Sequence, residues 1–320
     1  MKLFKIATVL LVTMFLFTGC GSKPVSQTEK RNKIKIVASV YPVYEFTKQV
    51  GKDKIELSML APAGGDPHDF EPTPKEIINI KSADIFIYHG ANLEPWIDNL
   101  KTKDTLKDVT IVEASNNIQL LEFADHHAHS HSSDNDNHNH SREHEHETDP
   151  HVWLDPERAM IEVNNIAKAL AQKDPKNAEY YKENARQYNL KLAKLDADFS
   201  ANKNFFKGQK LVTNHAAFGY LANKYGLEQV AVMGLTHDAE STPETIANIT
   251  NLCKEHQIKY IFTETVVNTK LTELVSKETG AEILVLNPLD ALTKEEIEQG
   301  KDYLSIMYEN LDNLKKAFVK

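Results

Sequence analysis

The chain has 320 residues, which is long enough for two ordinary domains with proper cores. Its 41% hydrophobic and 26% charged residues are the proportions of a soluble globular protein. The net charge of −9 argues against a nucleic-acid-binding protein.

The first twenty residues have the pattern of an export signal. Lys2 and Lys5 precede an apolar run over 6–17 that is too short to span a bilayer. The run leads into Thr18-Gly19-Cys20, which resembles the lipobox of bacterial lipoproteins, where the cysteine is lipidated and becomes the mature N-terminus. We therefore predict a signal peptide over 1–19, a lipidated Cys20 and a flexible tether over 20–32. A plain secretory signal is the alternative.

Short apolar runs alternate with helical stretches from residue 33 onward. Strands are predicted over 34–38, 55–60 and 83–88, and helices over 41–50 and 74–80. This alternation is typical of a parallel sheet covered by helices. We predict an N-terminal α/β lobe over 33–156. It includes a His-rich loop over 125–147 that lacks apolar periodicity and is expected to be disordered without metal.

Two helices are predicted to connect this lobe to the next, within 157–204. The first covers about 157–172, and the second follows Asp174-Pro175, an N-cap with proline at the first helical position, and continues to about Phe199. At 1.5 Å per residue the second helix would be about 35–40 Å long, a natural rigid connector. An ordinary surface helix of one lobe is the alternative.

Strand and helix patterns alternate again over 205–320, which we predict to be a second α/β lobe. Strands are expected near 210–212, 229–232, 258–262 and 282–286. A Ser241-x-x-Glu244 capping box is expected to open one helix, and a last helix is expected from about Thr293 to the C-terminus. With Cys20 lipidated, Cys253 has no disulfide partner and is expected to be a buried apolar residue.

Histidine is the most informative residue type in the chain. Three of the 14 histidines stand alone in short motifs. These are His68 after Pro67, His151 after Asp149-Pro150, and His215 after Asn214. Neutral imidazole is the commonest protein ligand for transition metals. Eight others crowd into the acidic, Ser/Asn-rich loop, namely His126, His127, His129, His131, His138, His140, His144 and His146. We predict a fixed metal site beside a loose metal collector; an accidental or solubilising linker is the alternative for the loop.

The isolated histidines fall where α/β sheets bind ligands. His68 follows the second predicted strand, His215 follows the first strand of the second lobe, and Asp290 follows the last. Open α/β sheets bind ligands beyond the carboxyl ends of their strands. Together with His151, which begins the segment leading to the connector, they would give the closed tetrahedral site that zinc favours. Asp290 could equally cap the helix expected near Thr293.

Five segments spread over the chain carry a specific pattern, namely 64–74 (GGDPHDFEPTP), 149–156 (DPHVWLDP), 214–221 (NHAAFGYL), 286–292 (LNPLDAL) and 302–311 (DYLSIMYENL). In these segments the chain resembles the zinc/manganese solute-binding lipoproteins of bacterial ABC importers, specifically their zinc branch. The resemblance implies two α/β lobes joined by a rigid helix, with one metal held between them. It also implies that His68, His151 and His215 match the three histidine ligands and that Asp290 matches the acidic fourth, often Glu in close relatives.

One loop departs from the family pattern. Residues 234–242 (GLTHDAEST) differ from the usual Ser-Pro version. His237 in this loop could be an auxiliary ligand or a solvated loop histidine. His89, at the end of the predicted strand 83–88, is expected to order the wall of the site.

The function implied by the resemblance is an extracytoplasmic, lipid-anchored zinc receptor, monomeric, that hands its ion to the membrane permease of an ABC importer. Zinc is favoured over manganese because His215 stands where the manganese members place an acidic residue. A manganese receptor of the same family and a surface adhesin with a structural metal are the alternatives.

The residue patterns argue against an enzyme. No His-Glu-x-x-His motif occurs, and residues 143–147 (EHEHE) have the wrong spacing for two histidines on one helical turn. A catalytic zinc keeps an open position for water, whereas three histidines and a carboxylate would fill the shell. We therefore expect metal content without hydrolytic turnover.

Overall fold

The structure is a computed structural model that describes residues 33–102, 105–123, 148–235, 242–266 and 269–319. The predicted signal peptide, Cys20, the tether, the eight histidines of the His-rich loop and His237 lie outside these ranges. None of the helices in the described ranges is both long and apolar enough to cross a membrane.

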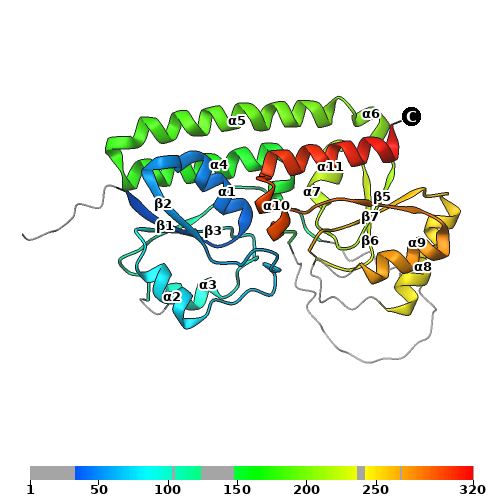
Figure 1. Ribbon diagram of the computed structural model, residues 1–320, viewed down its shortest axis with the longest axis horizontal. Coiled ribbons are helices and arrows are strands. Elements are labelled where there is room, and N and C mark those ends of the chain that lie inside the picture. Colours follow the sequence, from blue (N-terminus) through cyan, green and yellow to red (C-terminus); the bar gives the residue numbers. More distant parts are fainter. Residues whose placement is uncertain (1–32, 103–104, 124–147, 236–241, 267–268, 320) are drawn as a thin grey trace, which may run out of the picture. The chain divides into compact units, whose positions relative to one another are not determined.

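The N-terminal half is built on a four-stranded parallel sheet in the order β2-β1-β3-β4. Successive side chains of β1 point to opposite faces, because a strand has a period of two. Ile36 and Ala38 join the core beneath α1, whereas Val37 joins a separate core with α2 and α3. Figure 1 shows these helices on the two faces of the sheet. The elements are β1 (Ile34–Ala38), α1 (Tyr41–Gly51), β2 (Ile55–Met59), α2 (Pro74–Lys81), β3 (Ile85–Tyr88), α3 (Ile97–Thr102) and β4 (Thr110–Glu113).

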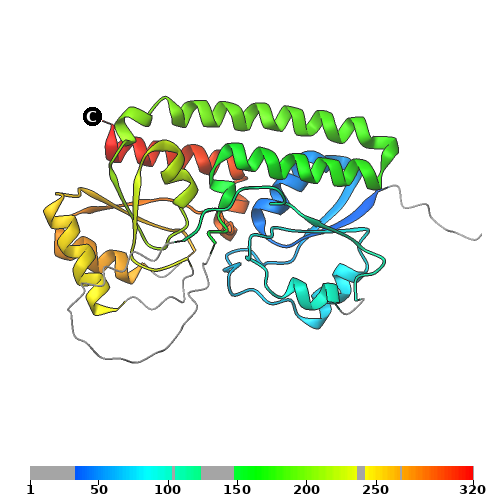
Figure 2. The ribbon, with the colours of Figure 1, turned by 180° about the vertical axis from the view of Figure 1, so that it is seen from behind.

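Two antiparallel helices follow, α4 (Pro156–Lys173) and α5 (Ala178–Ser200), and they pack along each other (Figure 2). Asp155 caps α4 by accepting a hydrogen bond from the backbone N–H of Glu157. The predicted pair Asp174-Pro175 opens a 3-10 turn that leads into α5, so the α-helix itself begins three residues later than predicted. Pro175–Asn177 form a 3-10 turn, and the Asp174 carboxylate accepts from Asn177 and from the Tyr181 hydroxyl instead of capping a helix.

The C-terminal half contains two pairs of parallel strands, β5-β6 and β7-β8, with β5 beside β7. Each strand pair is connected through a helix, which gives the α/β arrangement predicted from the alternation. The elements are α6 (Lys203–Phe206), β5 (Lys210–Thr213), α7 (Gly219–Tyr225), β6 (Glu228–Ala231), α8 (Pro243–Glu255), β7 (Tyr260–Thr263), α9 (Lys270–Thr279), β8 (Glu282–Val285), α10 (Lys294–Glu298) and α11 (Tyr303–Phe318).

Two helix boundaries in this half differ from the prediction. The cap of α8 is Thr242 rather than Ser241, because Pro243 is suited to the first helical position and the Thr242 hydroxyl accepts from the N–H of Thr245. The expected last helix is two helices. The chain turns at Gly300, whose φ of 71° is left-handed, and α11 starts anew behind an Asp302 cap.

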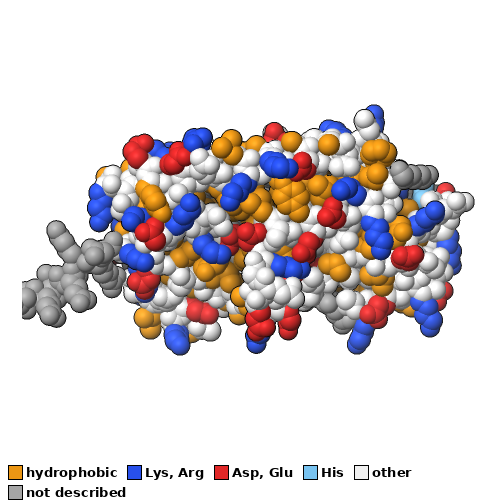
Figure 3. All heavy atoms as spheres, turned by 45° about the horizontal axis from the view of Figure 1, so that its top comes forward, with side chains coloured by type: hydrophobic (Ala, Val, Ile, Leu, Met, Phe, Trp, Pro, Cys, Tyr) orange, Lys and Arg blue, Asp and Glu red, His pale blue; other side chains and the backbone are white. Residues whose placement is uncertain are grey.

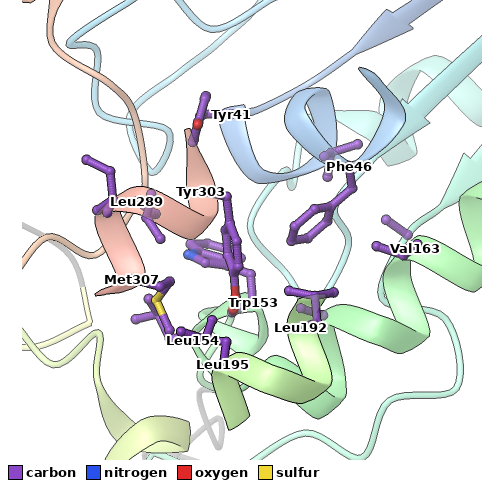
Figure 4. Close-up of a cluster of buried hydrophobic side chains, with 14 of the residues drawn as sticks. Tyr41, Phe46, Trp153, Leu154, Val163, Leu192, Leu195, Leu289, Tyr303 and Met307 are labelled. Carbon is purple, nitrogen blue, oxygen red and sulfur yellow. Dashed lines mark hydrogen bonds between the residues drawn. The ribbon is translucent and has the colours of Figure 1, made fainter. Parts of the chain in front are cut away.

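One continuous core joins the two halves. It contains Ile36 of β1, Val163 of α4, Leu192 of α5, Leu211 of β5 and Leu284 of β8. Figure 4 shows its centre, where side chains of α1, α4, α5 and α11 meet around Trp153. On the outer face that α5 forms, positive and negative side chains are interspersed (Figure 3).

Candidate metal site

Four predicted residues from four separate loops come together. His68 lies between β2 and α2, His151 immediately precedes the 3-10 turn Val152–Leu154, His215 follows β5, and Asp290 follows β8. One potential ligand atom from each lies within 4.8 Å of those from the other three. The rule that ligands gather beyond the carboxyl ends of parallel strands therefore correctly predicted the placement of His68, His215 and Asp290, whereas His151 follows no strand.

The distances within this cluster suit a single small cation. The Nε2 atom of His151 lies 3.1 Å from Nε2 of His68 and 3.4 Å from Nε2 of His215. The Asp290 carboxylate lies 3.8 Å from Nε2 of His151 through Oδ1 and 3.8 Å from Nε2 of His215 through Oδ2. Ligand atoms bound tetrahedrally at about 2.0–2.1 Å would lie about 3.3–3.4 Å apart.

Two buried carboxylates orient the rings of His151 and His215. Asp149 Oδ1 accepts from the backbone N–H of His151 at 2.9 Å and from its Nδ1 at 2.8 Å. Glu264 Oε1 accepts from the backbone N–H of His215 at 3.1 Å and from its Nδ1 at 2.7 Å. Because Nδ1 donates in both residues, the neutral rings present the lone pair of Nε2 to the centre of the cluster.

Neither carboxylate was assigned a role from the sequence, although Asp149 stands in the motif that contains His151. Glu264 comes directly after β7, so the strand-end rule that selected the ligands would also have found it.

The Asp290 carboxylate is buried in the cluster without a hydrogen bond from the described residues. The residue is 2% exposed, and neither of its carboxylate oxygens has a hydrogen-bond partner among the described residues. Burial raises the pKa of this carboxyl group to about 7, against the opposing effect of His215. A buried carboxylate without hydrogen bonds is costly, and a bound metal ion would supply the missing interaction. These two oxygens therefore fit a metal ligand better than the helix cap considered above.

Burial and charge also change the protonation of the surrounding groups. Burial raises the pKa of Asp149 to about 7. Burial lowers the pKa of His215, but the charge of Glu264 and the hydrogen bond to it outweigh this effect, so the net shift is upward. The site thus combines bases that bind protons near neutral pH and would exchange them for a metal ion.

Close packing fixes the position of the Asp149 carboxylate. A Cβ atom at Gly219 of α7 would lie 2.4 Å from Asp149 Oδ2. Only glycine leaves room there, so the carboxylate can approach α7 while it holds His151. Asp66 Oδ1 accepts from the backbone N–H of His68 at 2.8 Å, which fixes the turn that carries this histidine.

His89 orders the wall behind His151, as predicted. Its buried ring lies with Nε2 2.8 Å from the carbonyl oxygen of Pro150 and Nδ1 3.0 Å from Glu162 Oε1 of α4. Because a carbonyl only accepts, Nε2 donates to Pro150. His89 thereby ties the segment before His151 to both β3 and α4.

The chain has two halves, each built on parallel strands, and long helices join them. Loops of both halves meet at a buried polar site, which is the arrangement of an α/β solute-binding protein. The chain belongs to the family described as zinc-uptake complex component A, periplasmic, which matches residues 36–317.

Two curated relatives illustrate the match. The chain is 39% identical over 313 residues to the high-affinity zinc uptake system protein ZnuA of Bacillus subtilis (strain 168), covering 97% of this chain and 96% of the relative. It is 38% identical over 317 residues to the zinc-binding lipoprotein AdcA of Streptococcus pneumoniae (strain ATCC BAA-255 / R6), covering 99% of this chain but 61% of that longer protein.

Two solved structures share the fold. The Zn(II)-bound ZnuA-like domain of Streptococcus pneumoniae AdcA superposes with a TM-score of 0.75 at 38% identity, covering 90% of this chain and 100% of the other. The laminin-binding protein Lmb of Streptococcus agalactiae, described as bifunctional with adhesin and metal-transporting activity, gives a TM-score of 0.75 at 31% identity, with 89% and 99% covered.

Proposed function

We propose that this protein is a zinc receptor that binds one ion tightly through His68, His151, His215 and Asp290 and delivers it to the membrane permease of an ABC importer. In this proposal residues 1–19 are a signal peptide, and lipidated Cys20 with the tether 20–32 holds the protein outside the cytoplasm as a monomer. Residues 33–156 and 205–320 are the two lobes, and 157–204 connect them.

The Asp290 carboxylate carries the proposal, because its two oxygens have no hydrogen-bond partner among the described residues and face imidazole nitrogens. Nitrogen lone pairs and an ionised carboxylate repel one another unless a cation lies between them. Three nitrogens and one carboxylate suit zinc, whereas manganese prefers oxygen ligands in six-coordinate shells. The names of the relatives, which describe zinc uptake and zinc binding, support the same ion.

The same four ligands favour a receptor over an enzyme. They would complete a tetrahedral shell and leave no position for the water that a catalytic zinc activates. The ion is then cargo, which the protein binds and releases unchanged.

A competition titration tests the proposal. The metal-free protein is titrated with zinc and with manganese against a chromophoric chelator, beside His215→Ala and a matched control, His256→Ala, whose histidine is exposed at the end of α8. We expect one tight zinc site in the wild type and the control, its loss in His215→Ala, and much weaker manganese binding. A tight site that survives in His215→Ala would refute the ligand assignment, and manganese binding as tight as zinc binding would refute the ion.

A surface adhesin with a structural metal is the second candidate, favoured by the similarity to the laminin-binding protein Lmb. Immobilised laminin discriminates between the two functions. The protein is tested in cells that take up zinc and in cells that do not. Saturable binding to laminin that is equal in the two would support adhesion as a separate function. Absence of such binding, together with zinc uptake that depends on the protein, would leave the receptor function alone.

A further inference from the structure

An indole hydrogen bond connects the two halves of the metal site. The Nε1–H of Trp153 donates to the carbonyl oxygen of Pro288 at 2.8 Å, between residues 135 positions apart. Trp153 stands two residues after His151, and Pro288 stands two residues before Asp290. The bond therefore connects the segment that carries a ligand from the first half to the segment that carries a ligand from the second.

Trp153 is itself held in place from several directions. It is completely buried, and its carbonyl oxygen accepts from the hydroxyl of Tyr303 at the start of α11. Its ring makes edge-to-face contacts with His89 at 4.7 Å and with His151 at 5.3 Å between ring centroids. Figure 4 shows Trp153 beside Tyr303, with Leu289 nearby. An indole fixed in this way can act as a rigid spacer.

The segment that receives the hydrogen bond has an unusual backbone. Leu289 has a φ of 64°, a left-handed conformation that branched and bulky side chains rarely adopt. Asn287 supports it by accepting from the N–H of Leu289 at 2.8 Å. Asn310 of α11 clamps Asn287 in turn, accepting from its N–H and donating to its carbonyl, each at 2.8 Å. The direction in which Asp290 leaves the chain depends on this conformation, since Asp290 is the next residue.

We infer that Trp153 is a positioning residue for the metal site, whose Nε1–H bond to Pro288 sets the separation between His151 and Asp290. The inference rests on the proposed binding of zinc at these residues. Loss of the indole N–H leaves the buried Pro288 carbonyl without its donor and frees the 287–290 segment to shift, while both ligands remain chemically intact. The affinity for zinc should then fall, and the arrangement of ligands around the ion should change.

The variant Trp153→Phe tests this, with Trp96→Phe as its matched control. Trp96 is the other tryptophan of the chain and is also buried, but it lies in the core of α2 and α3, and its Nε1 has no hydrogen-bond partner among the described residues. Zinc affinity is measured by chelator competition, and the ligand geometry by the visible absorption of the cobalt(II) form. We expect Trp153→Phe to bind zinc about tenfold to a hundredfold more weakly, the range found for residues that orient metal ligands, and to shift the cobalt spectrum. We expect Trp96→Phe to match the wild type in both measurements.

A second variant guards against a simple loss of stability. Tyr303→Phe removes only the hydroxyl that donates to the Trp153 carbonyl, and we expect a smaller loss of zinc affinity with a cobalt spectrum shifted in the same direction. The inference would be overturned if both variants, Trp153→Phe and Tyr303→Phe, had the zinc affinity and the cobalt spectrum of the wild type. If Trp153→Phe does not fold, an unchanged cobalt spectrum in Tyr303→Phe would overturn it alone. A wild type that binds no zinc tightly would instead refute the proposed function.

Discussion

Glu264 fixes both the backbone and the ring of His215, because one carboxylate oxygen accepts from the backbone N–H at 3.1 Å and from Nδ1 at 2.7 Å. Asp149 does the same for His151. The two carboxylates differ in origin, since Asp149 is a near neighbour in the sequence and Glu264 is 49 residues away. Both rings are therefore oriented before an ion arrives, which lowers the cost of ordering them on binding.

Replacing Glu264 by glutamine should weaken zinc binding about tenfold to a hundredfold. The amide can donate to Nδ1 of His215, which would move the imidazole proton to Nε2, the atom that faces the site. Chelator competition measures the change. Glu228→Gln is the control, because Glu228 is an exposed partner of Lys210 and is expected to leave zinc affinity as in the wild type. Equal affinities of Glu264→Gln and wild type would contradict the prediction.

Replacing His215 by glutamate should weaken zinc binding and narrow its advantage over manganese, because an imidazole nitrogen is exchanged for the oxygen that manganese prefers. Calorimetric titration of both ions into both proteins gives the two affinity ratios. His256→Glu makes the same substitution at an exposed histidine and should keep the wild-type ratio. A zinc-to-manganese ratio unchanged in His215→Glu would show that this position does not select the ion.

Zinc affinity should fall as the pH drops through about 7. Burial raises the pKa of Asp290 to about 7, and the pKa of His215 is also raised, because Glu264 outweighs the lowering effect of burial. Zinc binds the deprotonated forms, so protons compete at and below these pKa values, and the competition disappears above them. Chelator competition over pH of about 6 to 8 measures this, and Asp290→Asn should flatten the profile. A flat profile in the wild type would contradict the assignment of these two ligands.

The fold could be predicted wherever a local pattern was strong. The run Ile34–Ala38 was assigned as a strand with its correct bounds, because it is apolar and β-branched. The strand Thr110–Glu113 was missed, since it is only four residues long and its apolar run, Ile111-Val112, is only two residues. The break at Gly300 was missed as well, because an isolated glycine in a helical pattern is often tolerated.

For the site, the sequence indicated which side chains would meet but not what would hold them. The convergence of the three histidines and Asp290 followed from strand ends and from the family resemblance, while their role as ligands stays a prediction. Glu264 could not be paired with His215, because that contact depends on β5 lying beside β7, which no local pattern reports. The same is true of Trp153 and Pro288, which belong to different halves of the chain.

Removing residues 125–147 should abolish weak zinc sites and keep the tight one. The eight histidines of this loop are closely spaced in the sequence and can chelate zinc in pairs, whereas the four residues proposed for the tight site lie together without any contribution from the loop. Competition with chelators of different strength separates the two classes. Loss of the tight site in the deletion variant would mean that the loop is part of it.

Replacing Cys20 by alanine should leave the protein without lipid. The prediction rests on the lysine-led apolar run that ends in Thr18-Gly19-Cys20. Growth with a radioactive fatty acid followed by immunoprecipitation measures the label on each protein. Cys253→Ala is the control and should be labelled as strongly as the wild type, since this cysteine is buried. Equal labelling of Cys20→Ala would refute the lipidation site.

The uneven burial of the four cluster residues has a consequence for the path of exchange. His151, His215 and Asp290 are buried, whereas His68 is partly exposed. In the proposed receptor, an ion that arrives from solvent would therefore meet the His68 imidazole first, and a departing ion would break its bond to His68 last. Step-by-step replacement of water by ligands, starting at this histidine, avoids the large cost of stripping the whole hydration shell at once. In the proposed receptor, the exposure of this one side chain would therefore set the path by which the ion enters and leaves the site.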